Sequence, residues 1–178
     1  MWNFWKKRMQ TGLLTEHPEL ETQQHTIAKT LKDQVKRHFA GSLAIRMVDS
    51  GSCNACEAEC NALSNPYYAL ERLGIHFVAS PRHADVMLLS GVVTANMWPY
   101  VMDCYEQLPA PKWVIALGDC PTNLSVFDKT FAIQGPVGES LPIAHIIPGC
   151  PPDPLTIMQG MLDFLSLLET QNIEHSEC

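Results

Sequence analysis

The sequence predicts an α/β protein in which helices cover both faces of a mostly parallel sheet. Segments with strand character alternate with helical segments along the chain, an order that favours parallel strands joined by helical crossovers. Residues 84–91 read ADVMLLSG, a continuous apolar run of the kind found in strands that are buried on both faces. The 178 residues, 46% of them hydrophobic and 17% charged, suit one globular domain with a substantial core.

Residues 1–40 are expected to form an N-terminal arm followed by a helix. Four apolar residues of this stretch recur at every fourth position and therefore share one face of a helix: Ile27, Leu31, Val35 and Phe39. Gly41 is the expected end of that helix. We assign residues 41–170 to the sheet domain and residues 171–178 to a C-terminal tail.

Five segments have the apolar composition of strands. They are SLAIRMV (42–48), IHFVAS (75–80), ADVMLLSG (84–91), KWVIALG (112–118) and PIAHIIPG (142–149). Four segments between and after them have helical character. They are CEAECNAL (56–63), PYYALERLG (66–74), NMWPYVMDCYEQL (96–108) and DPLTIMQGMLDFLSLLE (153–169). The last begins with Asp153 as N-cap and Pro154 at the first helical position. Residues 121–141 are weakly patterned, and a loop of that length is often functional.

The charge of the chain is unevenly distributed. The first 46 residues hold eight of the twelve Lys and Arg residues and four of the nineteen Asp and Glu residues, so the remainder is strongly acidic. An acidic body argues against nucleic acid as a partner, because nucleic acid requires a basic surface. The arm combines aromatic with basic side chains, a composition that suits a membrane surface or an acidic partner. These side chains are Trp2, Phe4, Trp5, Lys6, Lys7 and Arg8.

The sequence also indicates the compartment. It has no apolar run long enough to span a bilayer and no signal peptide, so we expect a cytoplasmic protein. In the cytoplasm, seven cysteines indicate metal or redox chemistry in preference to disulfide bonds.

Four cysteines follow the ends of predicted strands. Cys53 and Cys56 come after the first strand, Cys120 after the fourth and Cys150 after the fifth, with the spacing C-x2-C-x63-C-x29-C. Because ligands of open parallel sheets bind outside the carboxyl ends of the strands, we expect these thiols to converge there. Four thiolates suit a 4Fe–4S cluster or a zinc ion. One pair joined by two single cysteines from separate loops favours the larger cluster, although zinc or unligated core thiols remain alternatives.

Other reactive residues have less specific interpretations. Cys60 and Cys104 are expected in the core, and Cys178 at a mobile end. Glu57, beside Cys56, is a candidate for a partner-facing or proton-relaying carboxylate, and the alternative is a residue that stabilises the helix dipole. Arg82 and His83, before the third strand, are expected to be structural or interface residues. His76 and His145 are expected to be core histidines rather than ligands.

Four blocks of sequence carry a family resemblance. They are GSCNACEAE (51–59), SPRHADVMLLSG (80–91), GDC (118–120) and PGCPPDP (148–154). In this order they resemble the small, single-cluster subunit of membrane-bound, energy-converting nickel–iron hydrogenases. That family is homologous to the subunit of respiratory complex I, NADH:quinone oxidoreductase, that holds its terminal cluster. The resemblance covers roughly residues 40–168.

The resemblance implies a flavodoxin-like fold and one 4Fe–4S cluster with Cys53, Cys56, Cys120 and Cys150 as ligands. It implies an electron-transfer subunit of an oxidoreductase, without a catalytic site of its own. The expected partners are a large subunit with the nickel–iron centre, a ferredoxin-like iron–sulfur subunit and membrane-arm subunits. The expected location is peripheral, on the cytoplasmic side of the membrane.

The spacing of the first cysteine pair separates the two branches of this superfamily. Complex I subunits typically have adjacent cysteines, whereas Cys53-Asn54-Ala55-Cys56 has the hydrogenase-like spacing, with Ala55 in place of the usual Gly. Periplasmic uptake hydrogenases carry a C-terminal extension and a twin-arginine signal that we do not find. We therefore expect a hydrogenase subunit. The alternatives are a cluster subunit of a complex I-like quinone or sulfur oxidoreductase, and a structural zinc-binding scaffold.

Overall fold

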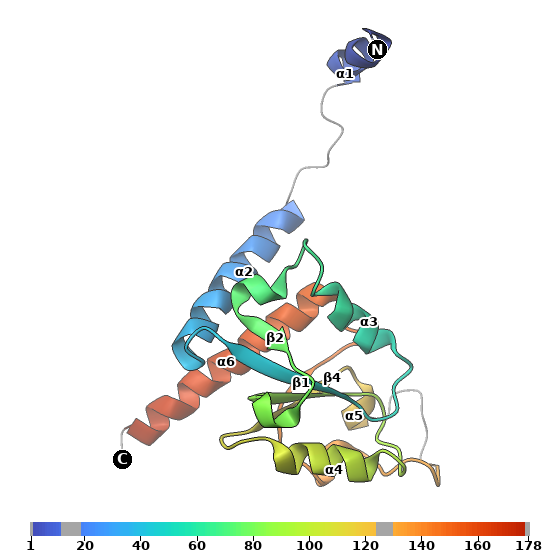
Figure 1. The fold of residues 1–178 in the computed structure, drawn as a ribbon, viewed down its shortest axis with the longest axis vertical. Helices are drawn as coiled ribbons and strands as arrows, with labels where there is room; N and C mark the ends of the chain where they lie inside the picture. The colour runs from blue at the N-terminus through green and yellow to red at the C-terminus, as the bar shows by residue number, and fades with distance from the viewer. Residues whose placement is uncertain (1, 12–18, 124–129, 177–178) are drawn as a thin grey trace.

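The computed structural model describes residues 2–11, 19–123 and 130–176, with side chains for 5–11, 23–123 and 130–169 (Figure 1). Within these residues five parallel strands form one sheet with the order β2-β1-β3-β4-β5. The strands are β1 (Leu43–Asp49), β2 (Ile75–Phe77), β3 (Val86–Ser90), β4 (Trp113–Leu117) and β5 (Ile143–Ile147). This is the strand order of flavodoxin-like folds, so the predicted fold class is confirmed.

The carboxyl ends of the central strands lie level with one another. Ser90, the last residue of β3, pairs with Asp49 at the end of β1 and with Leu117 at the end of β4. Leu117 in turn pairs with Ile147 at the end of β5. Segments that leave these strands therefore begin side by side at one edge of the sheet.

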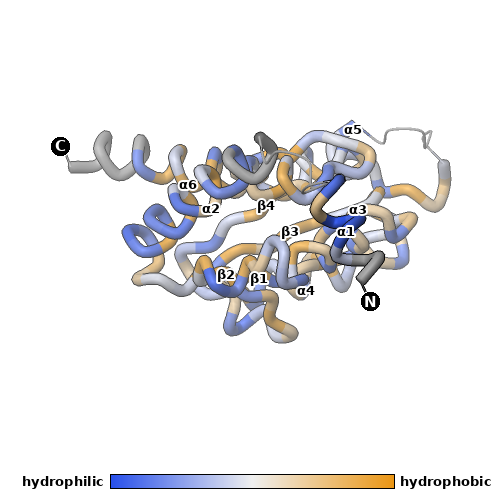
Figure 2. Tube along the Cα trace, turned by 90° about the horizontal axis from the view of Figure 1, so that it is seen from above, coloured by the Kyte–Doolittle hydropathy of each residue, from blue (hydrophilic) through white to orange (hydrophobic). Residues whose placement is uncertain are grey.

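Helices cover both faces of the sheet. The described α-helices are α1 (Trp2–Thr11), α2 (Glu19–His38), α3 (Ala55–Ala62), α4 (Trp98–Gln107), α5 (Cys120–Asn123) and α6 (Pro154–Ser176), and of these α2, α3, α4 and α6 bury side chains in the cores on the sheet. The helices α2, α3 and α6 bury apolar side chains in one core cluster with the sheet, and α4 does so in a second cluster on the opposite face. Figure 2 shows α2 and α6 on one side of the strands and α4 on the other.

Strand β3 is buried on both sides, as its continuous apolar sequence predicts. Leu88 belongs to the cluster beneath α2 and α6, whereas Met87 and Leu89 belong to the cluster beneath α4. All five residues of the strand are buried. A strand at the centre of a doubly covered sheet buries alternate side chains in opposite cores, which explains its uniform hydrophobicity.

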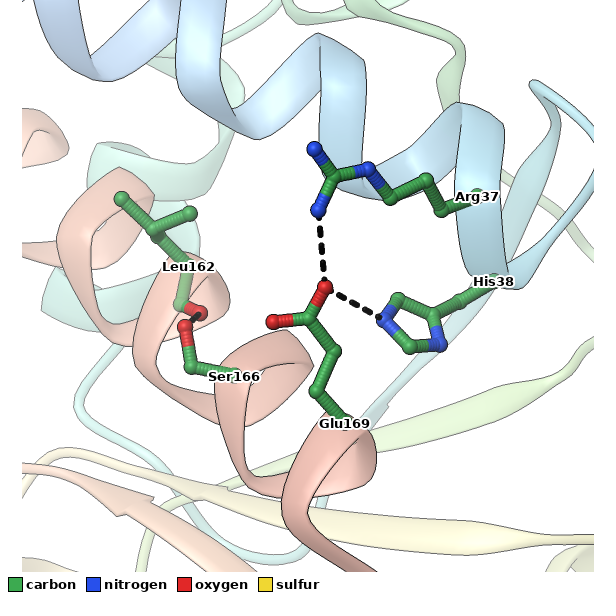
Figure 3. A network of polar contacts seen from close by, with 5 residues as sticks. All are labelled: Arg37, His38, Leu162, Ser166 and Glu169. Carbon is green, nitrogen blue, oxygen red and sulfur yellow. Dashed lines mark hydrogen bonds and ion pairs between the residues drawn. The ribbon is translucent and has the colours of Figure 1, made fainter. Parts of the chain in front are cut away.

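The ends of α2 and α6 lie together. Arg37 Nη1 donates a hydrogen bond of 2.9 Å to Glu169 Oε1, and His38 Nε2 lies 3.8 Å from the same oxygen (Figure 3). Leu31 and Val35 of α2 are fully buried in the core that α6 shares. The predicted apolar stripe of α2 is thus confirmed, and α2 is packed onto the sheet domain.

Two predicted helices differ from the structure. The segment 66–74 forms only a short 3-10 helix, Leu70–Leu73, because Ala69 takes a left-handed backbone with φ of 47° and cannot continue an α-helix. The closing helix continues to Ser176, beyond the predicted end at Glu169. Its start is as predicted, since Asp153 Oδ1 accepts a hydrogen bond of 3.1 Å from the Thr156 N–H.

The remaining short elements are the 3-10 helices Pro81–His83 and Val137–Glu139. They occupy the turn before β3 and the connection before β5. No helix among the described residues is both long and apolar enough to cross a membrane.

Candidate functional site

Four cysteines line one small cavity at the carboxyl edge of the sheet. They are Cys53, Cys56, Cys120 and Cys150. The first pair follows β1, whereas Cys120 and Cys150 follow β4 and β5, whose ends are aligned by the strand register. The structure therefore brings together the four cysteines that the sequence places beyond strand ends, while their role as ligands stays a prediction.

The rest of the cavity wall carries almost no side-chain bulk. It consists of Gly51, Ser52, Ala55, Gly91, Gly149 and Pro151. Apart from the cysteines, Ser52 supplies the single polar side chain of this wall. Across the described residues, no three His, Cys, Asp or Glu side chains are close enough together to hold one metal ion. The thiols thus surround the cavity without converging on a single point.

The four thiols differ in exposure. Cys53 and Cys150 are exposed, Cys120 is half-buried and Cys56 is buried at the base of α3. Burial raises the pKa of the Cys56 thiol to about 12, and the nearby Glu57 carboxylate and the other three cysteines contribute to the same rise. The cavity consequently has a buried side at Cys56 and an open side at Cys53 and Cys150.

The loop that carries Cys53 is held by local hydrogen bonds. Asp49 Oδ1 accepts from the N–H groups of Gly51 at 2.8 Å and Ser52 at 2.7 Å. Ser52 Oγ accepts from the Asn54 N–H at 2.8 Å, and Asn54 takes a left-handed φ of 70° before α3 begins. An aspartate followed by serine and glycine, as in Asp49-Ser50-Gly51, favours this kind of turn.

The Glu57 carboxylate accepts hydrogen bonds from two serines of the same chain. Its Oε2 accepts a hydrogen bond of 2.5 Å from Ser52 Oγ, and its Oε1 accepts one from Ser90 Oγ at the end of β3. The half-buried carboxylate thereby joins the cysteine loop, α3 and the sheet. Its predicted partner-facing or proton-relaying role stays a prediction.

Two glycines allow close backbone approach around the cavity. A Cβ on Gly118 would lie 3.0 Å from Cys56 Sγ, and a Cβ on Gly149 would lie 2.7 Å from Pro152 Cα. Both residues also have left-handed φ angles, of 81° and 136°. A residue with a side chain would be strained at either position.

The other cysteines lie elsewhere. Cys60 is buried in the core cluster beneath α2 and α6, where burial raises its pKa to about 12. Cys104 is buried in the cluster beneath α4. Both therefore have the predicted core environment, and neither lines the cavity. Cys178 lies outside the described residues.

Arg82, His76, His83 and His145 do not line the cysteine cavity. Arg82 and His83 are exposed at the amino end of β3, the edge opposite the cysteines. His76 and His145 are half-buried, so the prediction that they are core histidines is wrong. His145 lies on the edge strand β5, which has a neighbour on one side among the described strands, and its partial burial lowers its pKa.

Sequence reasoning missed the polar residues that hold the cysteine loops. Asp49, Ser90 and Asp119 stand at or just after strand ends. Asp49 holds its own loop through the N–H groups of Gly51 and Ser52, whereas Ser90 and Asp119 form hydrogen bonds to segments distant along the chain. A polar residue directly after an apolar strand is a weak signal by itself. It becomes meaningful once the strand order shows which loops are adjacent.

Comparison with known proteins places this site in a family. Residues 53–164 match the model of the family described as NADH ubiquinone oxidoreductase, 20 kDa subunit. A probable membrane-bound hydrogenase subunit of Pyrococcus furiosus is 45% identical over 115 residues, which cover 65% of this chain and 69% of that protein. An NADH-quinone oxidoreductase subunit of Citrifermentans bemidjiense is 44% identical over 107 residues, covering 60% of this chain but only 62% of that protein.

A solved structure supports the same assignment. The fold is similar to a chain of the archaeal membrane-bound sulfane sulfur reductase, with a TM-score of 0.65 and 29% sequence identity over 80% of this chain and 77% of that chain. The family match includes all four cavity cysteines and the strands between them. The chain therefore belongs to the family of the 20 kDa subunit of NADH:ubiquinone oxidoreductase, which includes relatives in membrane-bound hydrogenases.

Proposed function

We propose that this chain is the electron-transfer subunit of a membrane-bound nickel–iron hydrogenase and holds one 4Fe–4S cluster. The ligands would be Cys53, Cys56, Cys120 and Cys150. The observation that carries this proposal is that these four thiols, from three separate segments of the chain, line one cavity at the aligned strand ends.

The residues of the cavity fit such a cluster. Cysteine thiolates are the usual ligands of 4Fe–4S clusters, and the wall offers four of them without a carboxylate or imidazole. Glycines at the strand ends leave the backbone free to approach closely, which suits hydrogen bonds from N–H groups to cluster sulfur. The cluster, when bound, would supply one-electron transfer.

The chain itself positions the four thiols and leaves one side of the cavity open to a partner subunit. The parallel sheet fixes the strand ends, and the short loops after β1, β4 and β5 carry the thiols from that rigid edge. The exposed side of the cavity, at Cys53 and Cys150, is the side that a partner subunit would cover. We propose a large subunit with a nickel–iron centre on one side of the electron path and a ferredoxin-like iron–sulfur subunit on the other.

The spacing of the first pair favours the hydrogenase over its closest rival. Cys53 and Cys56 are separated by two residues, the hydrogenase-like pattern, and the Pyrococcus relative named as a hydrogenase subunit is 45% identical. The rival is a cluster subunit of a quinone or sulfur oxidoreductase. Its support is the similarity to the sulfane sulfur reductase structure and to the NADH-quinone oxidoreductase subunits.

We further propose a peripheral position on the cytoplasmic side of the membrane, docked to membrane-arm subunits. The helix α1 exposes Trp5 and Met9, whose side chains are 61% and 85% exposed. Lys6, Lys7 and Arg8 lie between them in the same helix. Exposed apolar side chains beside basic groups suit the interface of an anionic membrane.

The test of this function uses the complex purified with its native partners. Hydrogen evolution with a reduced low-potential donor and nickel in the large subunit are expected for the wild type. In Cys150→Ser, hydrogen evolution should fall while nickel is retained in assembled complexes, because the lost step is electron delivery. A wild-type complex without nickel that reduces quinone or polysulfide would favour the rival. A colourless complex with zinc at the four cysteines would instead favour the structural scaffold.

A further inference from the structure

The pairing of β4 with β5 continues beyond the strand ends into the cysteine loops. The Gly118 N–H donates to Ile147 O at 2.8 Å, and the Asp119 N–H donates to Gly149 O at 3.0 Å. The Gly149 N–H then donates back to the side chain of Asp119, at 3.0 Å from Oδ1. Asp119 and Gly149 are therefore joined by two reciprocal hydrogen bonds, and each directly precedes a cavity cysteine.

The hydrogen bond from the Gly149 N–H to the Asp119 side chain takes the place of a main-chain hydrogen bond of the sheet. Gly149 has turned out of the strand conformation, with a φ of 136°, so its N–H has left the regular ladder. The Asp119 carboxylate accepts that N–H where a main-chain carbonyl of the ladder would otherwise stand. Hydrogen bonds to a charged acceptor are stronger than those between neutral groups, so this bond is a substantial part of the connection between the two loops.

The main chain of Asp119 is anchored on its other side as well. Its carbonyl oxygen accepts from the Asn123 N–H at 2.9 Å, which closes the first turn of α5. Cys120 is the first residue of α5. Asp119 thus fixes the start of the helix that carries Cys120 while its side chain holds the loop that carries Cys150.

We infer that Asp119 is a positioning residue that sets the separation of Cys120 and Cys150 and adds a negative charge beside the cluster. This inference rests on the proposed function, because it assigns the residue a role toward the proposed cluster. Two effects follow, and they can be separated. The hydrogen bond should govern how firmly the cluster is held, whereas the charge should disfavour the reduced, more negative form and so lower the reduction potential.

Three variants of the intact complex separate these effects. Asp119→Ala removes both the acceptor and the charge. Asp119→Asn removes the charge but keeps a side-chain oxygen that can accept from Gly149. Asp103→Asn is the matched control, since Asp103 is exposed on α4 and its side chain accepts from Gln107 at 2.8 Å, away from the cavity wall.

The readouts are the rate of iron release to a chelator and the midpoint potential of the cluster, followed by electron paramagnetic resonance. Asp119→Ala should release this cluster's iron faster by roughly tenfold, as expected for loss of a charge-assisted hydrogen bond. Asp119→Asn keeps only a neutral acceptor, so it should release iron at a rate between those of the wild type and Asp119→Ala and show a higher midpoint potential. Asp103→Asn should match the wild type in both measurements.

A third measurement works without the cluster. In the metal-free full-length chain, hydrogen–deuterium exchange at Gly149 should be faster in Asp119→Ala than in wild type and Asp119→Asn. Unchanged iron release and potential in both Asp119 variants of a cluster-containing complex would overturn the inference and leave the proposed function intact. A wild-type complex without this cluster would overturn the proposed function and, with it, the role assigned to Asp119. Unchanged exchange at Gly149 would refute the hydrogen bond itself.

Discussion

Gly118 lies so close to Cys56 that a methyl group on its Cα would come within 3.0 Å of the Cys56 sulfur. The same methyl group would lie 3.1 Å from the Gly149 carbonyl oxygen, and Gly118 has a left-handed φ of 81°. Space and backbone conformation therefore both require glycine here. The residue thus lies between the buried Cys56 thiol and the Gly149 carbonyl of the loop that carries Cys150.

Gly118→Ala is expected to destabilise the fold and loosen the cysteine cavity. The left-handed backbone and the close contact should together cost roughly 1–3 kcal/mol of unfolding free energy. Cluster iron per chain should fall with it. Gly138→Ala is the matched control, because a Cβ there meets no atom within 4 Å and the backbone is not left-handed. Chemical unfolding and iron analysis check both variants, and equal behaviour of the two would contradict the close packing at Gly118.

Leu31→Ala tests whether α2 is part of the packed domain. Leu31 is fully buried between α2 and the sheet, so its truncation should lower the unfolding free energy by about 2–5 kcal/mol. Met9→Ala in α1 should change it by less than about 0.5 kcal/mol, since the Met9 side chain is 85% exposed. Urea unfolding of the full-length chain measures both. A small effect of Leu31→Ala would mean that α2 folds apart from the sheet.

The hydrogen bond between Arg37 of α2 and Glu169 of α6 predicts a pH dependence of stability. The hydrogen bond from Arg37 lowers the pKa of Glu169 below its usual range. A carboxylate with a depressed pKa in the folded state contributes stability above its unfolded pKa, and loses it as the pH falls through the folded pKa. The wild type should therefore be more stable than Glu169→Gln near pH 7, and the difference should shrink as the pH falls below about 4.3, the ordinary pKa of a glutamate.

This dependence is measured by denaturant unfolding at a series of pH values. Arg37→Gln removes the donor of the same bond and serves as the partner in a double-mutant cycle. The two substitutions should be less than additive at neutral pH and additive in acid. A constant difference between wild type and Glu169→Gln at all pH values would mean that the contact in Figure 3 does not depend on the charge of Glu169.

Removal of residues 1–12 is expected to weaken membrane attachment while leaving the cluster in place. The segment contains Lys6, Lys7 and Arg8, and each basic residue near an anionic lipid surface contributes about 1 kcal/mol. A variant with these three residues changed to Gln should lose part of the same attachment. Sedimentation of the complex with membranes measures it, and unchanged attachment of the truncated complex would show that the arm is dispensable.

Much of the fold can be predicted from sequence periodicity. The five strands and the stripe of α2 are recognisable because each buries a regular set of apolar side chains. The segment 66–74 has a helical composition, which predicts helical turns along its length, whereas the left-handed backbone at Ala69 limits it to a short 3-10 helix. Backbone conformation at a single non-glycine residue depends on tertiary packing, which local propensity does not report.

The candidate site is predictable only in part. The positions of the four cysteines after strands indicate the sheet edge, but the order of the strands decides which loops are neighbours. The roles of Asp119 and Ser90 are therefore hidden in the sequence, since each acts on a loop distant along the chain. The wrong prediction for His145 has a related cause, because the sequence pattern does not tell an edge strand from a central one.

One 4Fe–4S cluster held by Cys53, Cys56, Cys120 and Cys150 is the basis of the proposed function. The most direct test is iron and sulfide analysis of the anaerobically purified complex, comparing Cys120→Ser with Cys60→Ser. Cys60 is a buried core cysteine that does not line the cavity, so it controls for loss of a thiol in the same chain. We predict that Cys120→Ser loses about four iron atoms and four sulfides per complex and that Cys60→Ser keeps them. Equal loss in both variants, or no loss in Cys120→Ser, would contradict this assignment.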